Sequence, residues 1–179
     1  MKKYAAFFVL FLLCLGCASE KVALLEGMAL DGAPVCLENR SQIPALVRKF
    51  YATRDLTTEE GKIDYLIERV RTSSLVFIRN QVHYSGPGAA EFLRWKLRRL
   101  EKRWHVKVET AQDFVSQVAS GSRMSGDPYA VVLGDGSRHD LQDVLQNELN
   151  ALKACLQQGM VPPDEEGSVP ASTEQKTAE

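Results

Sequence analysis

The sequence predicts an α+β domain, in which about four helices cover a small antiparallel or mixed sheet of about three strands. The chain has 179 residues, of which 45% are hydrophobic and 25% charged, a composition typical of globular proteins and unlike that of disordered or collagen-like chains. Segments with apolar residues at helical spacing and short runs of strand-forming residues follow one another without strict alternation. That order favours an α+β fold over a parallel doubly wound sheet.

The first predicted helix spans residues 58–72 and opens a folded domain at residues 57–156. Thr57 and Glu60 have the spacing of a capping box, in which side chains satisfy free backbone amides at the helix start. One apolar stripe follows at helical spacing: Ile63, Leu66, Ile67 and Val70.

Three more helices are predicted downstream, each from its own start signal. Residues 86–88 open a helix to about residue 104, whose apolar stripe consists of Ala90, Leu93, Leu97, Leu100 and Trp104. Thr110 and Asp113 cap the next helix, which ends before Gly121. Asp140 caps the last helix, which carries leucines at helical spacing: Leu141, Leu145, Leu149, Leu152 and Leu156.

Two strands at residues 75–79 and 82–84 are predicted to form a hairpin around Asn80 and Gln81. A third strand at residues 129–133 ends in a turn-forming Gly-Asp-Gly run. Three short strands need helix cover to be stable, so we expect the helices to pack on this sheet.

The N-terminus has the pattern of a lipoprotein signal peptide. Residues 1–16 begin with two lysines, continue with an uncharged apolar run too short to span a bilayer, and end at Gly16. Gly16 and Cys17 match a bacterial lipobox, which predicts cleavage between them and acylation of Cys17. The alternative is an ordinary signal peptide, in which Cys17 is incidental.

Lipidation would place the protein outside the cytoplasm on a membrane. Cys17 is followed by Ala18 and Ser19 rather than by an aspartate, which in Gram-negative lipoproteins is typical of outer-membrane delivery. We therefore expect the periplasmic face of the outer membrane, or the cell-surface membrane in a Gram-positive host.

The predicted domain has an extension at each end. Residues 17–56 are interpreted as a lipidated tether and partial cap, with one short helix around residues 43–51. Residues 157–179 are acidic and rich in proline, which predicts a disordered tail. Export to an oxidising compartment favours a Cys36–Cys155 disulfide, with two separate thiols as the alternative.

Several short motifs follow one another in a characteristic order between about residues 59 and 152: Lys62 to Ile67, Phe77 to Asn80, Ala89-Ala90 with Leu93 to Leu97, Thr110 to Phe114, and Ser125 to Tyr129. In this combination they resemble the YfeK-like family of small exported bacterial proteins, a domain of unknown function. The resemblance implies an exported single α+β domain and no particular activity. Gln81 and Asp127 depart from the family pattern, where a turn glycine and a basic residue are expected.

The helix at residues 86–104 carries the most informative surface. Its charged side is basic, with a single Glu101 among Arg94, Lys96, Arg98, Arg99, Lys102 and Arg103. At 100° per residue, Phe92 and Trp95 fall within this basic side. Such a face suits an anionic lipid surface, lipopolysaccharide phosphate or another envelope polyanion. The interpretation that we favour is the plainer one, in which Phe92 and Trp95 pack on the sheet while the arginines are solvated, because isolated runs of charge usually form solvated faces.

A small polar loop is the second candidate site. Residues 120–126 precede Tyr129, and their Ser122, Ser125 and Gly126 give the loop the composition of a binding loop. If a pocket exists, we expect it between this loop and the strand that carries His83 and Tyr84.

The remaining chemistry-bearing residues form no recognised motif. His83, His105 and His139 lack the spacing of metal ligands, and neither a nucleophile elbow nor a phosphate-binding loop is present. A triad of Ser137, His139 and Asp140 is disfavoured, because Asp140 is better explained as a helix cap. We therefore expect no catalytic residue, metal or cofactor.

Together these patterns predict a membrane-anchored envelope lipoprotein whose domain is a non-catalytic binding module. The net charge of −1 argues against a nucleic-acid partner. One alternative is a small periplasmic hydrolase that uses Ser122 or Ser125. A second alternative is a structural or assembly factor of the envelope.

Overall fold

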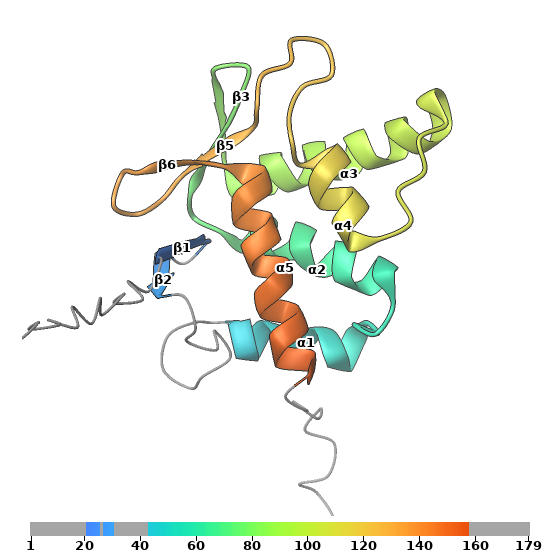
Figure 1. Ribbon diagram of the computed structural model, residues 1–179, viewed down its shortest axis with the longest axis vertical. Coiled ribbons are helices and arrows are strands. Elements are labelled where there is room, and N and C mark those ends of the chain that lie inside the picture. The colour runs from blue at the N-terminus through green and yellow to red at the C-terminus, as the bar shows by residue number, and fades with distance from the viewer. Residues whose placement is uncertain (1–20, 26, 31–42, 158–179) are drawn as a thin grey trace, which may run out of the picture.

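The computed structural model describes residues 21–25, 27–30 and 43–157, shown in colour in Figure 1. The predicted signal peptide, Cys17, Cys36 and the acidic tail lie outside the described residues, so the hypotheses about them stay predictions.

An α+β fold is confirmed: a four-stranded antiparallel sheet packs with helices in the order β4-β3-β5-β6. The strands are β3 (Val76–Arg79), β4 (Val82–Tyr84), β5 (Ala130–Val132) and β6 (Arg138–Asp140). Strand β6 is absent from the sequence prediction of three strands, and its His139 pairs with Val131 of β5. Gly136, at φ +84°, makes the tight turn that brings β6 back along β5.

The predicted hairpin between β3 and β4 is confirmed, with Phe77 opposite Tyr84 and Arg79 opposite Val82. Asn80 and Gln81 both have left-handed backbones, with φ of +47° and +63°. Two successive positive φ values define a two-residue turn whose twist matches that of the strands, although glycine is the preferred residue at the second position.

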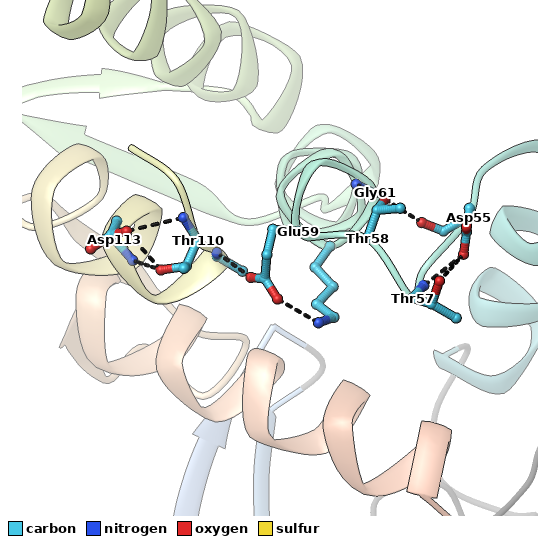
Figure 2. Close-up of polar contacts among 9 residues, drawn as sticks. Asp55, Thr57, Thr58, Glu59, Gly61, Thr110 and Asp113 are labelled. Carbon is cyan, nitrogen blue, oxygen red and sulfur yellow. Dashed lines mark hydrogen bonds and ion pairs between the residues drawn. The ribbon is translucent and has the colours of Figure 1, made fainter. Parts of the chain in front are cut away.

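Helix α2 (Glu59–Thr72) begins one residue later than the capping box expected at Thr57 and Glu60. Thr58 is the N-cap, and its hydroxyl accepts a hydrogen bond from the Gly61 amide at 3.1 Å. Thr57 instead donates from its amide and its hydroxyl to Asp55, at 2.8 and 2.6 Å (Figure 2). The predicted stripe of α2 is buried, and Tyr65 and Arg69 are buried as well.

The third predicted helix consists of α4 (Ala111–Asp113), followed by a five-residue π-helical segment, η1 (Phe114–Val118). Its capping box is confirmed, because Thr110 and Asp113 exchange side-chain and backbone hydrogen bonds (Figure 2). Glu59 accepts a hydrogen bond from the Ala111 amide at 2.8 Å and thereby joins the starts of α2 and α4.

The two long helices are α3 (Gly86–Trp104) and α5 (Leu141–Gln157). Gly86 lies so close to the end of α2 that a Cβ atom there would be 2.4 Å from the Ser73 carbonyl oxygen. Helix α5 buries its leucine stripe, although Leu156 is only partly covered. Asp140, expected to cap α5, is the last residue of β6. Between sheet and helices lies one apolar core, which includes Leu66, Phe77, Leu93, Phe114, Val131, Leu145 and Leu149.

An N-terminal hairpin, absent from the sequence prediction, packs on α5. It consists of β1 (Lys21–Leu24) and β2 (Gly27–Leu30). The Leu25 amide donates to buried Glu148 at 2.8 Å, and Asn147 donates to the Ala23 carbonyl at 2.9 Å. Arg69 completes the arrangement through two hydrogen bonds to Glu148, at 3.0 and 3.1 Å.

Helix α1 (Ile43–Thr53) agrees with the short helix expected in this region and contributes Val47 and Phe50 to the core. The Phe50 ring packs edge-on against Tyr65, with centroids 5.5 Å apart. Because β1 and α1 lie in the segment interpreted as a tether and partial cap, and the described residues there add Ala23, Val47 and Phe50 to the core, this part of the segment packs on the domain as a cap would.

Cys155 is fully buried and disulfide-bonded, and its partner lies outside the described residues. The pairing with Cys36 therefore stays a prediction. In the described ranges, no helix combines the length and the hydropathy that crossing a membrane requires.

Candidate binding surface along helix α3

Aromatic rings and cationic side chains contact one another in series along α3. The Arg79 guanidinium lies 3.9 Å from the centroid of Phe92, whose ring is 5.5 Å from that of Trp95. Arg99 lies 5.0 Å from the Trp95 ring and 5.6 Å from the Trp104 ring. Arg123 adds a contact of 5.3 Å to Trp104. We call this set the cation–aromatic row: Arg79, Phe92, Trp95, Arg99, Trp104 and Arg123.

The row draws its members from three elements. On β3, Arg79 lies on the same face as buried Phe77, because side chains two apart share a face of a strand, and this face packs toward α3. Arg123 comes from the loop after η1. Phe92 and Trp104 are twelve residues apart on α3, so the helical part of the row is about 18 Å long.

The cations of this surface lack carboxylate partners within the described part of the chain. Arg94, expected on the basic face, pairs at 3.1 Å with Asp64, a carboxylate that Arg54 shares at 3.4 Å. No ion pair within the described residues involves the other cations of α3 and its neighbours: Arg79, Arg98, Arg99, Lys102, Arg103 and Arg123. The buried Nε of Arg79 also has no hydrogen-bond partner there. The result is a strip of uncompensated positive charge.

The aromatic residues follow the helical-wheel expectation in part. Trp95 is 43% exposed, as predicted for the basic side. Trp104 was expected to face the core but is 40% exposed. Phe92 is half-buried, edge-on against Tyr129 at 5.6 Å, so the favoured interpretation that it packs inward is correct for this ring.

Lys96 was assigned to the charged side but is buried. Its ammonium group donates to the carbonyls of Val118 and Gly121, at 2.7 and 2.6 Å. Helical segments end with carbonyls that have no partner within the segment, and Lys96 satisfies these where η1 ends. Burial and the charges of Arg123 and Arg79 lower the pKa of Lys96 to about 8.

Tyr129, one of the expected loop-site residues, is buried beneath this surface. Lys96 lies 4.8 Å from its ring centroid. Burial raises the pKa of the Tyr129 phenol, while the nearby Arg79 partly opposes that change. Tyr129 therefore packs against Phe92 and Lys96, and at 4% exposure its side chain is not accessible to a ligand.

The other loop-site residues stabilise their own turn. Ser122 is buried, and its hydroxyl accepts from the Ser125 amide at 3.3 Å. Ser125 donates to the Asn80 side chain at 3.2 Å, which ties the loop to the β3–β4 turn. Beside this tie lies an open cleft of about 390 Å³, lined by Ile78, Asn80, Gln81, His83, Asp127, Pro128 and Arg138.

The Ser137 and His139 pair does not form a hydrolytic triad. The Ser137 hydroxyl donates to Asp135 at 2.6 Å and also lies 2.9 Å from His139 Nε2. Which atom donates in the Ser137–His139 contact depends on the imidazole tautomer. Within the described residues, no carboxylate is hydrogen-bonded to His139, as the third member of a triad would be. Hydrogen bonds from Ser137 also hold the pKa of Asp135 below its usual value. Within the described residues, no cluster of three or more potential metal ligands occurs.

Sequence reasoning identified Trp95, Arg98, Arg99, Lys102 and Arg103 but missed Arg79 and Arg123. Arg79 could have been found from the sequence. In the predicted strand at residues 75–79, side chains two apart share a face, so Arg79 lies on the same face as Phe77. Arg123 joins the row only through the return path of the loop after η1, for which the sequence contains no local signal.

The comparisons with known proteins agree with a compact domain but assign it no activity. Neither the curated proteins nor the solved structures include a match to this chain. Residues 57–153 match the model of a family of unknown function, DUF5329. This match covers more than half of the chain and includes all of α2, the four-stranded sheet and α3. The chain therefore belongs to the DUF5329 family.

Proposed function

We propose that the protein is an envelope lipoprotein, held on a membrane by acyl chains on Cys17, whose domain is a non-catalytic binding module. The proposed partner carries phosphate groups and binds along α3. The finer resemblance to YfeK-like exported proteins is part of this proposal, as is delivery to the periplasmic face of the outer membrane.

One observation carries the proposal for the domain: the surface of α3 holds cations without carboxylate partners beside two exposed tryptophans. Arginine is suited to phosphate because its planar guanidinium offers paired donors. Stacking on an aromatic ring leaves the edge of the guanidinium, which carries these donors, available. Arg99, between Trp95 and Trp104, is placed in this way.

The proposal for the anchor rests on the lipobox around Cys17. Each buried methylene of an acyl chain contributes about 0.8 kcal/mol, so two or more chains hold a protein on a bilayer almost permanently. A binding domain with modest affinity then acts at high local concentration, because its anchor has already restricted it to one surface.

A periplasmic enzyme is the alternative, and the cleft beside Ser125 is the observation in its favour. His83 lines that cleft. Within the described part of the chain, however, no histidine is hydrogen-bonded to Ser122 or Ser125, so neither hydroxyl has a base in place. An assembly factor of the envelope, the third hypothesis, would use the same α3 surface against a protein.

The test of the binding module is a charge reversal with a matched control. Arg98→Glu with Arg99→Glu removes two of the unpaired cations, whereas Arg48→Glu with Lys49→Glu makes the same charge change on exposed residues of α1. We expect the first variant alone to lose binding to lipopolysaccharide and to anionic vesicles at low salt. Equal loss in both variants, or no binding by the unaltered chain, contradicts the proposal.

The test of the anchor is independent of the domain. We expect the product of the natural sequence to lose residues 1–16, to gain the mass of acyl chains, and to partition with membranes. Cys17→Ser should abolish the added mass. An unprocessed chain without added hydrocarbon, found in the cytosol, contradicts this part.

A further inference from the structure

The loop between η1 and β5 exposes an apolar side chain at its tip. Met124 is 97% exposed, more than any other large hydrophobic side chain among the described residues. Its neighbour Arg123 stacks on Trp104, so the tip lies next to one end of the cation–aromatic row. In Figure 1 the loop projects at the same end of the molecule as the β3–β4 hairpin.

Several hydrogen bonds hold this loop in a defined shape. The Ser122 amide donates to the Asp127 carbonyl, and the Gly126 amide donates to the Ser122 carbonyl, both at 2.8 Å. Gly126 has φ of +79°, a backbone conformation that glycine adopts without strain. At the base of the loop, Gly121 and Pro128 form an isolated bridge, and Lys96 binds the Gly121 carbonyl. The fold thus holds Met124 in the solvent on a braced turn.

The exposed apolar groups and the cations have complementary positions. Trp104 lies between Arg99 and Arg123, and Trp95 lies beside Arg99. Tryptophan is the side chain most typical of the boundary between lipid headgroups and acyl chains, where arginines pair with the phosphates. A soluble polyanion would satisfy the arginines but would leave Met124 in water.

We propose that Met124, Trp104 and Trp95 enter the headgroup–acyl boundary of an anionic phospholipid leaflet, while Arg99 and Arg123 bind its phosphates. This inference rests on the proposed function, because it uses the same cations, and it specifies the partner as a lipid surface. Charge complementarity selects anionic over zwitterionic lipid, and the exposed methionine selects a bilayer over a soluble polymer.

The chain offers a direct probe of this surface, because Trp95 and Trp104 are its only tryptophans. The chain from residue 18 onward contains all described residues and lacks both the predicted signal peptide and the acyl chains. We expect its tryptophan emission to shift to the blue with phosphatidylcholine vesicles that contain phosphatidylglycerol. Lipids brominated on their acyl chains should quench this emission, and vesicles of phosphatidylcholine alone should cause neither effect.

Met124→Ser tests the apolar tip, and Val76→Ser is its matched control, because Val76 is 41% exposed at the end of β3 that lies away from the β3–β4 turn. Partial burial of one methionine predicts that Met124→Ser weakens vesicle binding about tenfold. Val76→Ser should bind as the unaltered chain does. Retained binding by the Met124→Ser variant, or equal loss in both variants, overturns the inference.

A binding experiment with a soluble polyanion distinguishes failure of this inference from failure of the proposed function. If long-chain polyphosphate binds in an Arg99-dependent way but vesicles cause no blue shift and no quenching, the phosphate-binding module stands and the lipid contact is overturned. If neither polyphosphate nor vesicles bind, the proposed function of the domain fails with it.

Discussion

Lys96 stabilises the fold by binding backbone carbonyls and also lies within the electrostatic influence of the α3 surface cations. It is buried and donates to the last carbonyls of η1. Burial lowers its pKa to about 8, and the charges of Arg123 and Arg79 contribute in the same direction. An anion bound at Arg79 or Arg123 would offset part of the positive charge that acts on Lys96.

The lowered pKa of Lys96 predicts an unusual dependence of stability on pH. The pKa is about 8 in the folded state and 10.5 in the unfolded chain, so between these values the unfolded state binds more protons. The free energy of unfolding should therefore rise as pH increases from 8 to 10.5, by an amount on the order of 3 kcal/mol. Below pH 8 the contribution should be constant.

Urea unfolding at several pH values measures this effect, with Lys96→Met as the reference. The variant lowers overall stability because it leaves the Val118 and Gly121 carbonyls without their donor, but it should lack the rise attributed to Lys96. Tyr129 and other groups titrate in both proteins, so the difference between the two curves isolates the lysine. Parallel curves contradict the assignment.

At the scale of elements, regular structure with a local signal was predicted well. The leucine stripe of α5, the apolar stripe of α2 and the capping box of Thr110 and Asp113 need only neighbouring residues to form. The hairpin of β3 and β4 was also predictable, because two runs of strand formers flank two turn residues.

The missed features depend on partners distant in sequence. The β1–β2 hairpin is held by Asn147 and Glu148, which are more than 120 residues away in the sequence. The residues of the hairpin itself contain no pattern that predicts these contacts. Likewise, a helical wheel places Lys96 by angle alone and contains no information about the carbonyls of η1. The candidate site was therefore half-predicted: its α3 residues were identified, and its contributions from β3 and the loop were not.

The β3–β4 turn gives a test at the scale of one element. Gln81 has φ of +63°, where a residue with a Cβ is strained and glycine is not. Gln81→Gly should raise the free energy of unfolding by about 1 kcal/mol. Val82→Gly, at the adjacent strand position, should lower it. Thermal unfolding of both variants measures these changes in the free energy of unfolding. A Gln81→Gly variant that is less stable than the unaltered chain contradicts the left-handed turn.

At the scale of the whole molecule, the N-terminal hairpin limits how far the domain could lie from the proposed anchor at Cys17. Residues 17–56 were interpreted as a lipidated tether and partial cap. Strand β1 begins at Lys21, only four residues after Cys17, and its end is held by Glu148 and Asn147. Four extended residues span at most about 14 Å, so an acylated Cys17 would keep the body directly on the leaflet.

This geometry predicts a short distance that a spacer can lengthen. In vesicles with an energy acceptor on the headgroups, the acylated protein should show strong transfer from Trp95 and Trp104. A Gly/Ser segment of about twenty residues inserted after Glu20 should weaken the transfer most when Arg99→Glu also removes a cation from the α3 surface. Equal transfer in all variants, with acylation verified by mass, would show that the position of β1 does not set the height of the domain.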